Sequence, residues 1–352
     1  MAEAAAVAVS TGAVVASVVA AAAVASVDSP AVAAVSAEAA HPVDGKYDII
    51  FVLPYPFTDH PSFPEGVLKR YLEINGFSVG VIETPFWQQA DSMGVLGRPQ
   101  LFFAIISGPV DSIVLNYTAN RKRRNTDLYQ MNGTGFFDGY PPSIKYKIRP
   151  DMVSVVFANR IRQLYKQIPI VIGGVEASQR TFSHFDFQKE KIKRSILFDS
   201  RADLLVNGMG EKQVLNIARY MRDGGEVSRS SVPGTSRIVG SGEPLMDSDL
   251  DFLSLPDHSQ VVSDPKAILE LEKKVMTARQ SGKALIQRVD NRSVVQFPSQ
   301  PYSRCDLDTI YGLDYARQHP GKRKQSEALK MNLFSITSHR GCGGGCAFCA
   351  IA

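Results

Sequence analysis

Three cysteines lie within one short loop near the C-terminal end of the sequence. They are Cys342, Cys346 and Cys349, in the spacing C-x3-C-x2-C, and three glycines separate the first two. Each thiolate on so flexible a backbone can bind one iron of a [4Fe-4S] cluster. The fourth iron then has no protein ligand. Because an electron-transfer ferredoxin closes all four positions with cysteine, the spacing favours chemistry at the cluster over electron transfer.

Zinc is the competing metal, because the three thiolates together with His339 could form a tetrahedral site. Zinc sites usually place their ligands in two separate C-x2-4-C knuckles, and the sequence contains no second knuckle. The fourth cysteine, Cys305, stands apart, and we interpret it as an ordinary thiol. Four cysteines in 352 residues exclude a disulfide-rich secreted scaffold.

The elements that must position this loop begin after His41, where short apolar runs alternate with segments of helical periodicity. This alternation is typical of a parallel α/β sheet. A helix is expected from Pro64 to about Asn75, and the expected strands are 49–53, 78–82, 101–106, 153–157, 168–172 and 203–206. Glycines follow the last two strands, at Gly173-Gly174 and Gly208-Met209-Gly210. Ligand binding and tight turns both remain open for them.

Residues 226–242 are rich in Ser and Gly and indicate a domain boundary near Gly225. A charged helix is expected from Pro265 to about Gln280, followed by a hairpin of residues 284–287 and 293–296 and a strand-like run into the cysteine loop. The sequence therefore predicts a low-complexity Ala/Val-rich tail (1–44), a Rossmann-like domain (45–225), a linker or adaptor region with a helix and a hairpin (226–333), and the start of a further domain (334–352).

Charge and composition exclude several functions. The chain has 39 Lys and Arg against 35 Asp and Glu, an excess too small to indicate nucleic acid. For the run Arg121–Arg124 we favour a solvated charged face over a grip on phosphate or RNA. The tail contains no Leu, Ile or Phe in its apolar stretch and no Lys or Arg, so we expect neither a membrane span nor a targeting peptide. No G-x-G-x-x-G run follows the first strand and no P-loop occurs, which disfavours dehydrogenases and ATPases.

At the cysteine loop the sequence resembles the radical S-adenosylmethionine (SAM) superfamily, whose loop is C-x3-C-x-aromatic-C, with Phe348 as the aromatic residue. Beyond the loop, over about residues 48–350, it is similar to the YgiQ-type radical SAM proteins. The runs that carry this similarity are Asp111-Ser112, Asn120-Arg121-Lys122-Arg123-Arg124, Gly173-Gly174-Val175-Glu176-Ala177-Ser178, Arg194-Ser195-Ile196-Leu197, Gly208-Met209-Gly210-Glu211 and Ser335-Ile336-Thr337-Ser338-His339-Arg340-Gly341-Cys342.

The resemblance implies that Cys342, Cys346 and Cys349 bind a [4Fe-4S] cluster and that SAM binds at the open iron. Reductive cleavage would give methionine and a 5′-deoxyadenosyl radical, which abstracts hydrogen from an unknown substrate. By the same resemblance the backbone near Phe348 meets the adenine, and a flavodoxin or ferredoxin supplies the electron. Free thiols indicate a reducing compartment, so we expect the cytoplasm.

Two further expectations follow from the resemblance. The N-terminal domain is similar to the cobalamin-binding-type Rossmann domains that precede some radical SAM barrels, but no D-x-H-x-x-G run occurs, which leaves cobalamin possible but unsupported. The family places a partial TIM-like barrel after the cysteine loop, whereas this sequence stops at Ala352, so only the first strand and cluster loop of the barrel are expected. Three interpretations follow: a truncated radical SAM enzyme, a binding or assembly module completed by another polypeptide, and a zinc-binding or inert remnant.

Overall fold

The computed structural model describes residues 44–137, 146–243, 250–322 and 324–341. Within these ranges nine strands form one sheet in the order β2-β1-β3-β4-β7-β8-β11-β10-β9. The first five, which we call the parallel half, run parallel to one another: β2 (Val79–Glu83), β1 (Ile49–Leu53), β3 (Phe102–Ile106), β4 (Ile170–Gly173) and β7 (Leu204–Val206).

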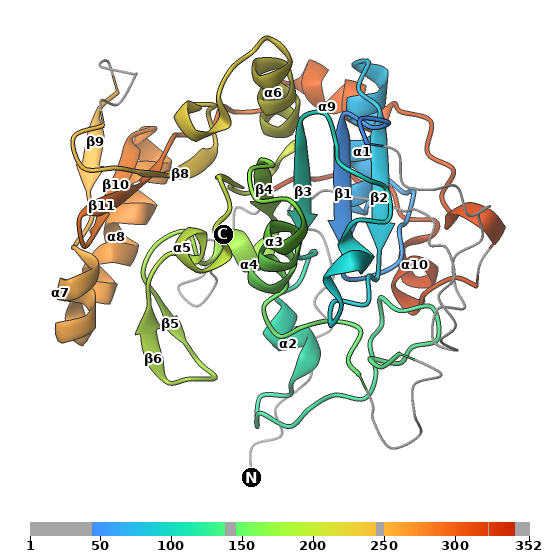
Figure 1. Cartoon of the computed structure of the whole chain (residues 1–352), viewed down its shortest axis with the longest axis horizontal. Coiled ribbons are helices and arrows are strands. Elements are labelled where there is room, and N and C mark those ends of the chain that lie inside the picture. Colours follow the sequence, from blue (N-terminus) through green and yellow to red (C-terminus); the bar gives the residue numbers. More distant parts are fainter. Residues whose placement is uncertain (1–43, 138–145, 244–249, 323, 342–352) are drawn as a thin grey trace.

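The other four strands, which we call the mixed half, extend this sheet in the direction away from β2. β8 is antiparallel to both β7 and β11, β11 is antiparallel to β10, and β9 is parallel to β10. Figure 1 shows the parallel half on the right and the mixed half on the left. The strands of the mixed half are β8 (Thr235–Val239), β11 (Arg292–Gln296), β10 (Ala284–Val289) and β9 (Phe252–Ser254).

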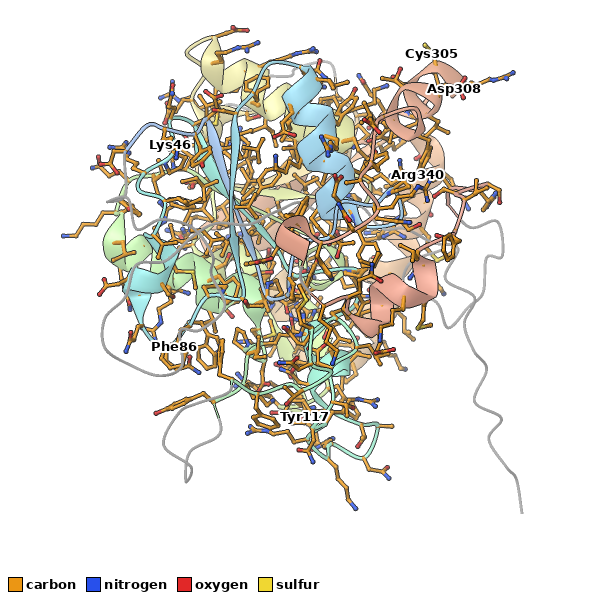
Figure 2. All side chains as sticks on the ribbon, turned by 90° about the vertical axis from the view of Figure 1, so that its right-hand side faces the viewer. Lys46, Phe86, Tyr117, Cys305, Asp308 and Arg340 are labelled. Atoms are coloured by element: carbon orange, nitrogen blue, oxygen red, sulfur yellow. The ribbon has the colours of Figure 1, made fainter. Side chains whose placement is uncertain are left out.

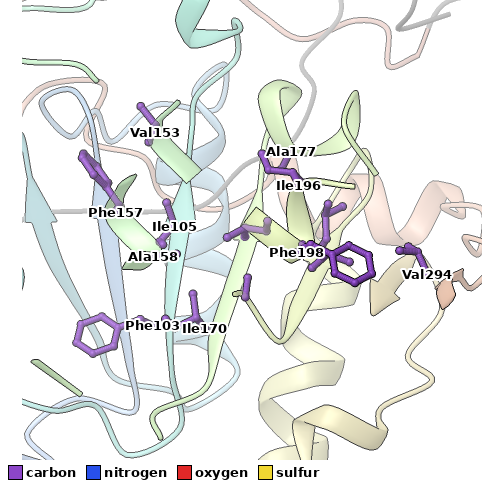
Figure 3. Close-up of a cluster of buried hydrophobic side chains, with 14 of the residues drawn as sticks. Phe103, Ile105, Val153, Phe157, Ala158, Ile170, Ala177, Ile196, Phe198 and Val294 are labelled. Atoms are coloured by element: carbon purple, nitrogen blue, oxygen red, sulfur yellow. The ribbon is translucent and has the colours of Figure 1, made fainter. Parts of the chain in front are cut away.

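Helices enclose both faces of the parallel half. α1 (Pro64–Ile74) and α6 (Glu211–Arg222) pack on the face to which Ile49, Phe51 and Leu53 point. α3 (Val153–Leu164) packs on the other face, and Figure 3 shows its Val153, Phe157 and Ala158 beside Phe103 and Ile105 of β3. Because both faces are covered, these strands are apolar at almost every position.

The remaining described elements are short or lie at the periphery. The helices and 3-10 turns are η1 (Ala90–Met93), α2 (Ser112–Asn116), α4 (Val175–Ser178), α5 (Ile196–Ser200), η2 (Val227–Arg229), α7 (His258–Ser263), α8 (Pro265–Ser281), α9 (Arg304–Tyr311), η3 (Pro320–Lys322) and α10 (Glu327–Asn332). A separate two-stranded hairpin consists of β5 (His184–Asp186) and β6 (Lys191–Lys193).

Most of the expected elements are confirmed, and one expected strand is wrong. The strands expected at 49–53, 78–82, 101–106, 168–172 and 203–206 are β1, β2, β3, β4 and β7, and the hairpin expected after residue 284 is β10 and β11. The strand expected at 153–157 is instead the first part of α3. Its buried side chains, among them Val153, Phe157 and Ile161, recur at helical spacing. The β-branched run Val153-Ser-Val-Val imitates a buried strand, because a short apolar run does not distinguish the two.

The sheet continues across residue 225, where the sequence indicated a boundary, because β8 pairs with β7. The division into domains itself stays a prediction. The strand-like run before the cysteine loop forms no strand within residues 334–341. Phe334 and Ile336 there are 90% and 84% exposed. A strand needs a neighbour to exchange backbone hydrogen bonds with, and this segment has none among the described residues.

No helix in the described part of the chain combines the length and the apolar character needed to cross a bilayer. The Ala/Val-rich tail, residues 1–43, falls outside the described ranges.

Candidate functional site

The structure describes the chain up to Gly341, one residue before the cysteine loop. Cys342, Cys346, Cys349 and Phe348 therefore lie outside the described residues. Within the described ranges, no group of three or more His, Cys, Asp or Glu side chains is arranged to hold a metal. Cys305 is exposed on α9. The described residues that lead directly to the loop are 333–341, which we call the approach segment.

The loop that follows β1 holds the beginning of the approach segment. His60 Nε2 lies 3.3 Å from the Leu333 carbonyl oxygen, and the hydroxyls of Ser62 and Ser335 are 2.9 Å apart. Burial lowers the pKa of His60, so its ring is neutral at pH 7. Because the Ser62 N–H donates to Nδ1 at 3.0 Å, a neutral ring carries its proton on Nε2, which faces the Leu333 carbonyl oxygen and, also at 3.3 Å, Arg317 Nη1. Arg317 adds a hydrogen bond to the Ser335 carbonyl at 3.3 Å.

A buried ion pair holds the other end of the approach segment. The guanidinium of Arg340, 5% exposed, contacts the carboxylate of Glu211, 2% exposed. The second oxygen of Glu211 accepts the hydroxyl hydrogen of Tyr302 at 2.9 Å. The guanidinium carbon lies 5.4 Å from the centre of the Tyr302 ring and 5.7 Å from that of Tyr311. Arg340 is therefore enclosed by a carboxylate and two aromatic rings.

The electrostatics of this enclosure favour its charged form. Burial is the largest single influence and lowers the pKa of Arg340, but the charge and hydrogen bond of Glu211 together with Tyr311 and Tyr302 outweigh it, and the pKa is raised. Burial and the same carboxylate raise the pKa of Tyr302, so its hydroxyl keeps its proton and stays a donor. The Arg340 cation thus faces Glu211, which also accepts the hydrogen bond of the neutral Tyr302.

Glu211 reaches Arg340 because of the way the chain leaves β7. After Val206 the backbone turns through Gly208, with a φ of 67°, and Glu211 opens α6 directly behind Gly210. In a parallel sheet the residues after each strand gather at one edge, the carboxyl edge. The run Gly208-Met209-Gly210-Glu211 thereby brings a carboxylate to the segment that precedes the cysteines, 129 residues later in the chain.

The second glycine of the pair at the end of β4, Gly174, has a structural explanation at the same edge. Gly174 has a φ of 96°, and a Cβ placed there would lie 2.6 Å from Ser107 Oγ and 3.0 Å from the Gly108 carbonyl oxygen. A glycine is therefore required where the loops after β3 and β4 touch. Nearby, the buried Glu176 accepts the backbone N–H groups of Val153 at 3.2 Å and Ser154 at 2.8 Å, which stabilises the start of α3.

A second buried polar cluster lies where the strand order reverses, between β1 and β3. Tyr55 donates its hydroxyl hydrogen to Glu65 at 3.3 Å, and burial raises the pKa of Glu65 to about 8. Arg149 and Asp127, 1% and 4% exposed, form an ion pair of 2.7 Å, and the guanidinium of Arg149 lies 5.7 Å from the Tyr55 ring centre. Tyr129 packs beside Tyr55, with their ring centres 5.7 Å apart.

This crevice is the usual ligand position in a doubly wound sheet. Here the ring of Tyr55, 1% exposed, fills it, and a Cβ at Gly108 would lie 2.8 Å from that ring. The described residues thus do not fit a large cofactor at this point, and no sequence run offers a histidine ligand for cobalamin.

The basic run lies on a different part of the surface. Arg121 pairs with Glu190, both of them exposed, and the guanidinium carbon of Arg123 lies 5.9 Å from the Tyr117 ring centre. Figure 2 shows Tyr117 and Arg340 well apart on the molecule. These contacts match a solvated charged face.

Sequence reasoning placed Glu211 and Arg340 in runs shared with a known family but assigned neither a role. Their presence in those runs is the sequence signal that could have identified them. No signal in the sequence identified His60 or Tyr302, because only the fold brings them to the approach segment.

Comparison with known proteins yields both a family match and individual relatives. The family model described as Radical SAM N-terminal matches residues 33–335. The chain is 40% identical over 311 residues to a UPF0313 protein of Clostridium botulinum, 37% over 309 to one of Geobacter sulfurreducens and 39% over 311 to one of Thermotoga neapolitana. Each alignment covers 86% of this chain and 46%, 49% and 52% of the respective relative. The chain thus spans about half the length of these curated relatives.

Proposed function

Because this chain belongs to the Radical SAM N-terminal family and resembles the UPF0313 (YgiQ-type) proteins, we propose that it carries the cluster-binding loop of a radical SAM enzyme. In this proposal Cys342, Cys346 and Cys349 bind a [4Fe-4S] cluster, and the backbone near Phe348 meets the adenine of SAM. Three thiols in one glycine-rich loop fit such a cluster chemically, since each iron but one receives a thiolate. When bound, the cluster supplies the electron that cleaves SAM reductively.

One observation carries the proposal: the residue two positions before Cys342 is fixed at the carboxyl edge of the sheet. Arg340 is held there by Glu211 and Tyr302. A glycine-rich loop alone gives its cysteines no defined place. With Arg340 fixed, the loop starts from a defined point at the edge where α/β sheets bind ligands.

The chain's own residues supply binding and orientation. The neutral His60 and the hydroxyl of Ser62 keep the beginning of the approach segment in place, and Glu211 keeps its end. Substrate recognition belongs to the whole protein, so the substrate is left unnamed. We further propose that the protein acts in a reducing compartment such as the cytoplasm, because oxidising conditions oxidise free thiols and degrade a cluster that has an open iron. We also propose that it receives electrons from a flavodoxin or ferredoxin.

The test loads the 352-residue chain anaerobically with iron and sulfide and then measures bound metal and the visible spectrum. We expect a brown protein with iron-sulfur absorption, and a change in the electron paramagnetic resonance spectrum of the reduced cluster when SAM is added. Cys346→Ala should lose the iron, while Cys305→Ala, which alters the exposed thiol of α9, should keep it. Stoichiometric zinc without iron would establish the zinc alternative, and a SAM-responsive cluster in Cys346→Ala would refute the ligand assignment.

A further inference from the structure

The approach segment has no strand partner within the described part of the chain, so a few side-chain contacts determine its course. At its beginning these contacts are hydrogen bonds to His60, Ser62 and Arg317. At its end the contact is the buried pair of Arg340 with Glu211. Only the second contact lies next to the cysteines.

Attaching a segment through a buried ion pair costs the desolvation free energy of two charges. Taking both charges out of water costs about as much as their attraction returns, and an apolar pair of similar volume would often be equally stable. The ion pair also constrains the orientation of the Arg340 side chain. The guanidinium carbon lies near both rings while Nη2 contacts the carboxylate, and such neighbours orient a planar guanidinium more strictly than a flexible lysine ammonium.

Chain geometry limits how far the first cysteine can lie from Arg340. Two residues of extended chain span at most about 7 Å, so the Cα atom of Cys342 lies within that distance of the Cα atom of Arg340. Whatever fixes Arg340 therefore limits where the first cysteine can stand relative to the carboxyl edge.

We propose that Arg340 is a positioning residue for the cysteine loop, and that Glu211 and Tyr302 hold it in that role. This inference rests on the proposed function in one respect, namely that the loop binds a cluster. The residues that face Arg340 come from three elements: Glu211 from α6, Tyr311 from α9 and Tyr302 from the stretch before α9. Arg340 thus contacts both the helix that follows the parallel half and the segment that follows the mixed half.

The first test uses trypsin on the metal-free chain, because Arg340-Gly341 is itself a tryptic bond. With Arg340 buried, cleavage after it should be slow compared with cleavage after the exposed Lys122 of the basic run, which serves as the internal reference. In Glu211→Gln the guanidinium loses its counter-charge, and a buried unpaired cation is driven toward water. We expect cleavage after Arg340 to accelerate several-fold while cleavage after Lys122 is unchanged.

Ser62→Ala is the matched control, since it removes a contact at the far end of the same segment. It should leave cleavage after Arg340 close to that of the unaltered chain. Equal rates in Glu211→Gln and in the unaltered chain would overturn the proposal. So would equal acceleration by Ser62→Ala, because then the segment would be loosened as a whole.

The second test separates positioning from stability in the cluster-loaded chain. Arg340→Met should keep its iron but lose or broaden the change that SAM causes in the paramagnetic resonance spectrum, and Arg340→Lys should restore it only in part. A purely structural role predicts an unaltered spectrum from a smaller amount of folded protein. If Arg340→Met fails to fold, Glu211→Gln decides the question with the same two readouts. Failure of the unaltered chain to bind a cluster refutes the proposed function, whereas the trypsin result still tests how Arg340 is held.

Discussion

The parallel half and the mixed half share one sheet but differ in how they are enclosed. Every residue of β1 and β3 is buried, because helices cover both faces there. In β10 and β11 buried positions are interspersed with partly or fully exposed ones, and α7 and α8 pack against this half. Enclosure on both faces also buries the polar groups at the carboxyl edge of the parallel half, which is where the approach segment lies. The part of the sheet that excludes water most completely is thus the part that receives the approach segment.

Removing one partner of an ion pair should change the unfolding free energy most and show the largest difference between the two halves. Arg149→Met leaves Asp127 buried without a counter-charge at the carboxyl edge, which we expect to cost about 4 kcal/mol of unfolding free energy. Lys283→Met breaks a pair with Asp251 in the mixed half, where the two side chains are 40% and 70% exposed, and should cost less than about 1 kcal/mol. Urea unfolding measures both. Similar losses would mean that the two halves do not differ in enclosure.

Glycine substitutions give the next largest contrast. Gly174→Ala combines a positive φ with a Cβ only 2.6 Å from Ser107 Oγ, and we expect a loss of about 3 kcal/mol. Gly282→Ala, at the end of α8, also has a positive φ but meets no atom within 4 Å, so about 1 kcal/mol is expected. The difference between the two unfolding free energies reports the close approach of the two loops together with the backbone conformation of Gly174, whose φ of 96° and ψ of 178° lie in a region essentially limited to glycine. A difference near zero would contradict the packing at that edge.

The pH dependence of stability should depend on Glu65. Burial raises its pKa in the folded state to about 8, against 4.5 in the unfolded chain. Between pH 5 and 7 the folded protein therefore keeps a proton that the unfolded chain has lost, and stability falls as the pH rises. One proton contributes at most about 1.4 kcal/mol per pH unit, so about 2 kcal/mol is expected over this interval.

Glu65→Gln should remove that slope. Its control is Glu243, beside the mixed half. Burial acts to raise the pKa of Glu243, but hydrogen bonds from Gly240 and Arg237 lower it overall. Glu243→Gln should therefore leave the slope between pH 5 and 7 as it is. Denaturant titrations at pH 5, 6 and 7 make the comparison, and an unchanged slope in Glu65→Gln would show that Glu65 is ionised in the folded protein.

Removal of one methyl group gives the smallest expected effect. Ile172→Val, in β4, should cost about 1 kcal/mol, because the neighbours of a fully buried side chain relax only partly into the space. Ile286→Val, in β10, alters a side chain that is only partly buried, and about 0.5 kcal/mol is expected. Thermal unfolding of both variants, repeated to resolve this difference, checks it. A larger loss in β10 would reverse the ranking of the two halves.

The difference between the halves also explains which parts of the fold could be predicted from the sequence. Strands buried on both faces appear as continuous apolar runs, and five of them were found in this way. The same criterion failed at Val153, because a buried amphipathic helix that begins with Val-Ser-Val-Val produces a similar run. β8 lies inside a stretch rich in Ser and Gly, and its place beside β7 follows from the rest of the sheet and not from its own residues.

In the candidate site, the features that the sequence predicts and those that it does not differ in the distance along the chain between the residues involved. The cysteine spacing indicates a metal by itself, since the three ligands are neighbours in the chain. The pairing of Arg340 with Glu211 joins positions 129 residues apart, and neither residue has a sequence pattern that identifies its partner. Local chemistry could therefore be predicted, whereas its attachment to the sheet required the fold.

The groups that hold the approach segment are synthesised before the approach segment itself. His60, Glu211 and Tyr302 all precede residue 333, and the five strands of the parallel half are complete by Val206. Domains synthesised first can fold first on the ribosome. The surface that receives the approach segment can therefore be assembled before the ribosome adds Cys342. On this schedule the three cysteines are added to a chain in which the parallel half of the sheet can already be folded.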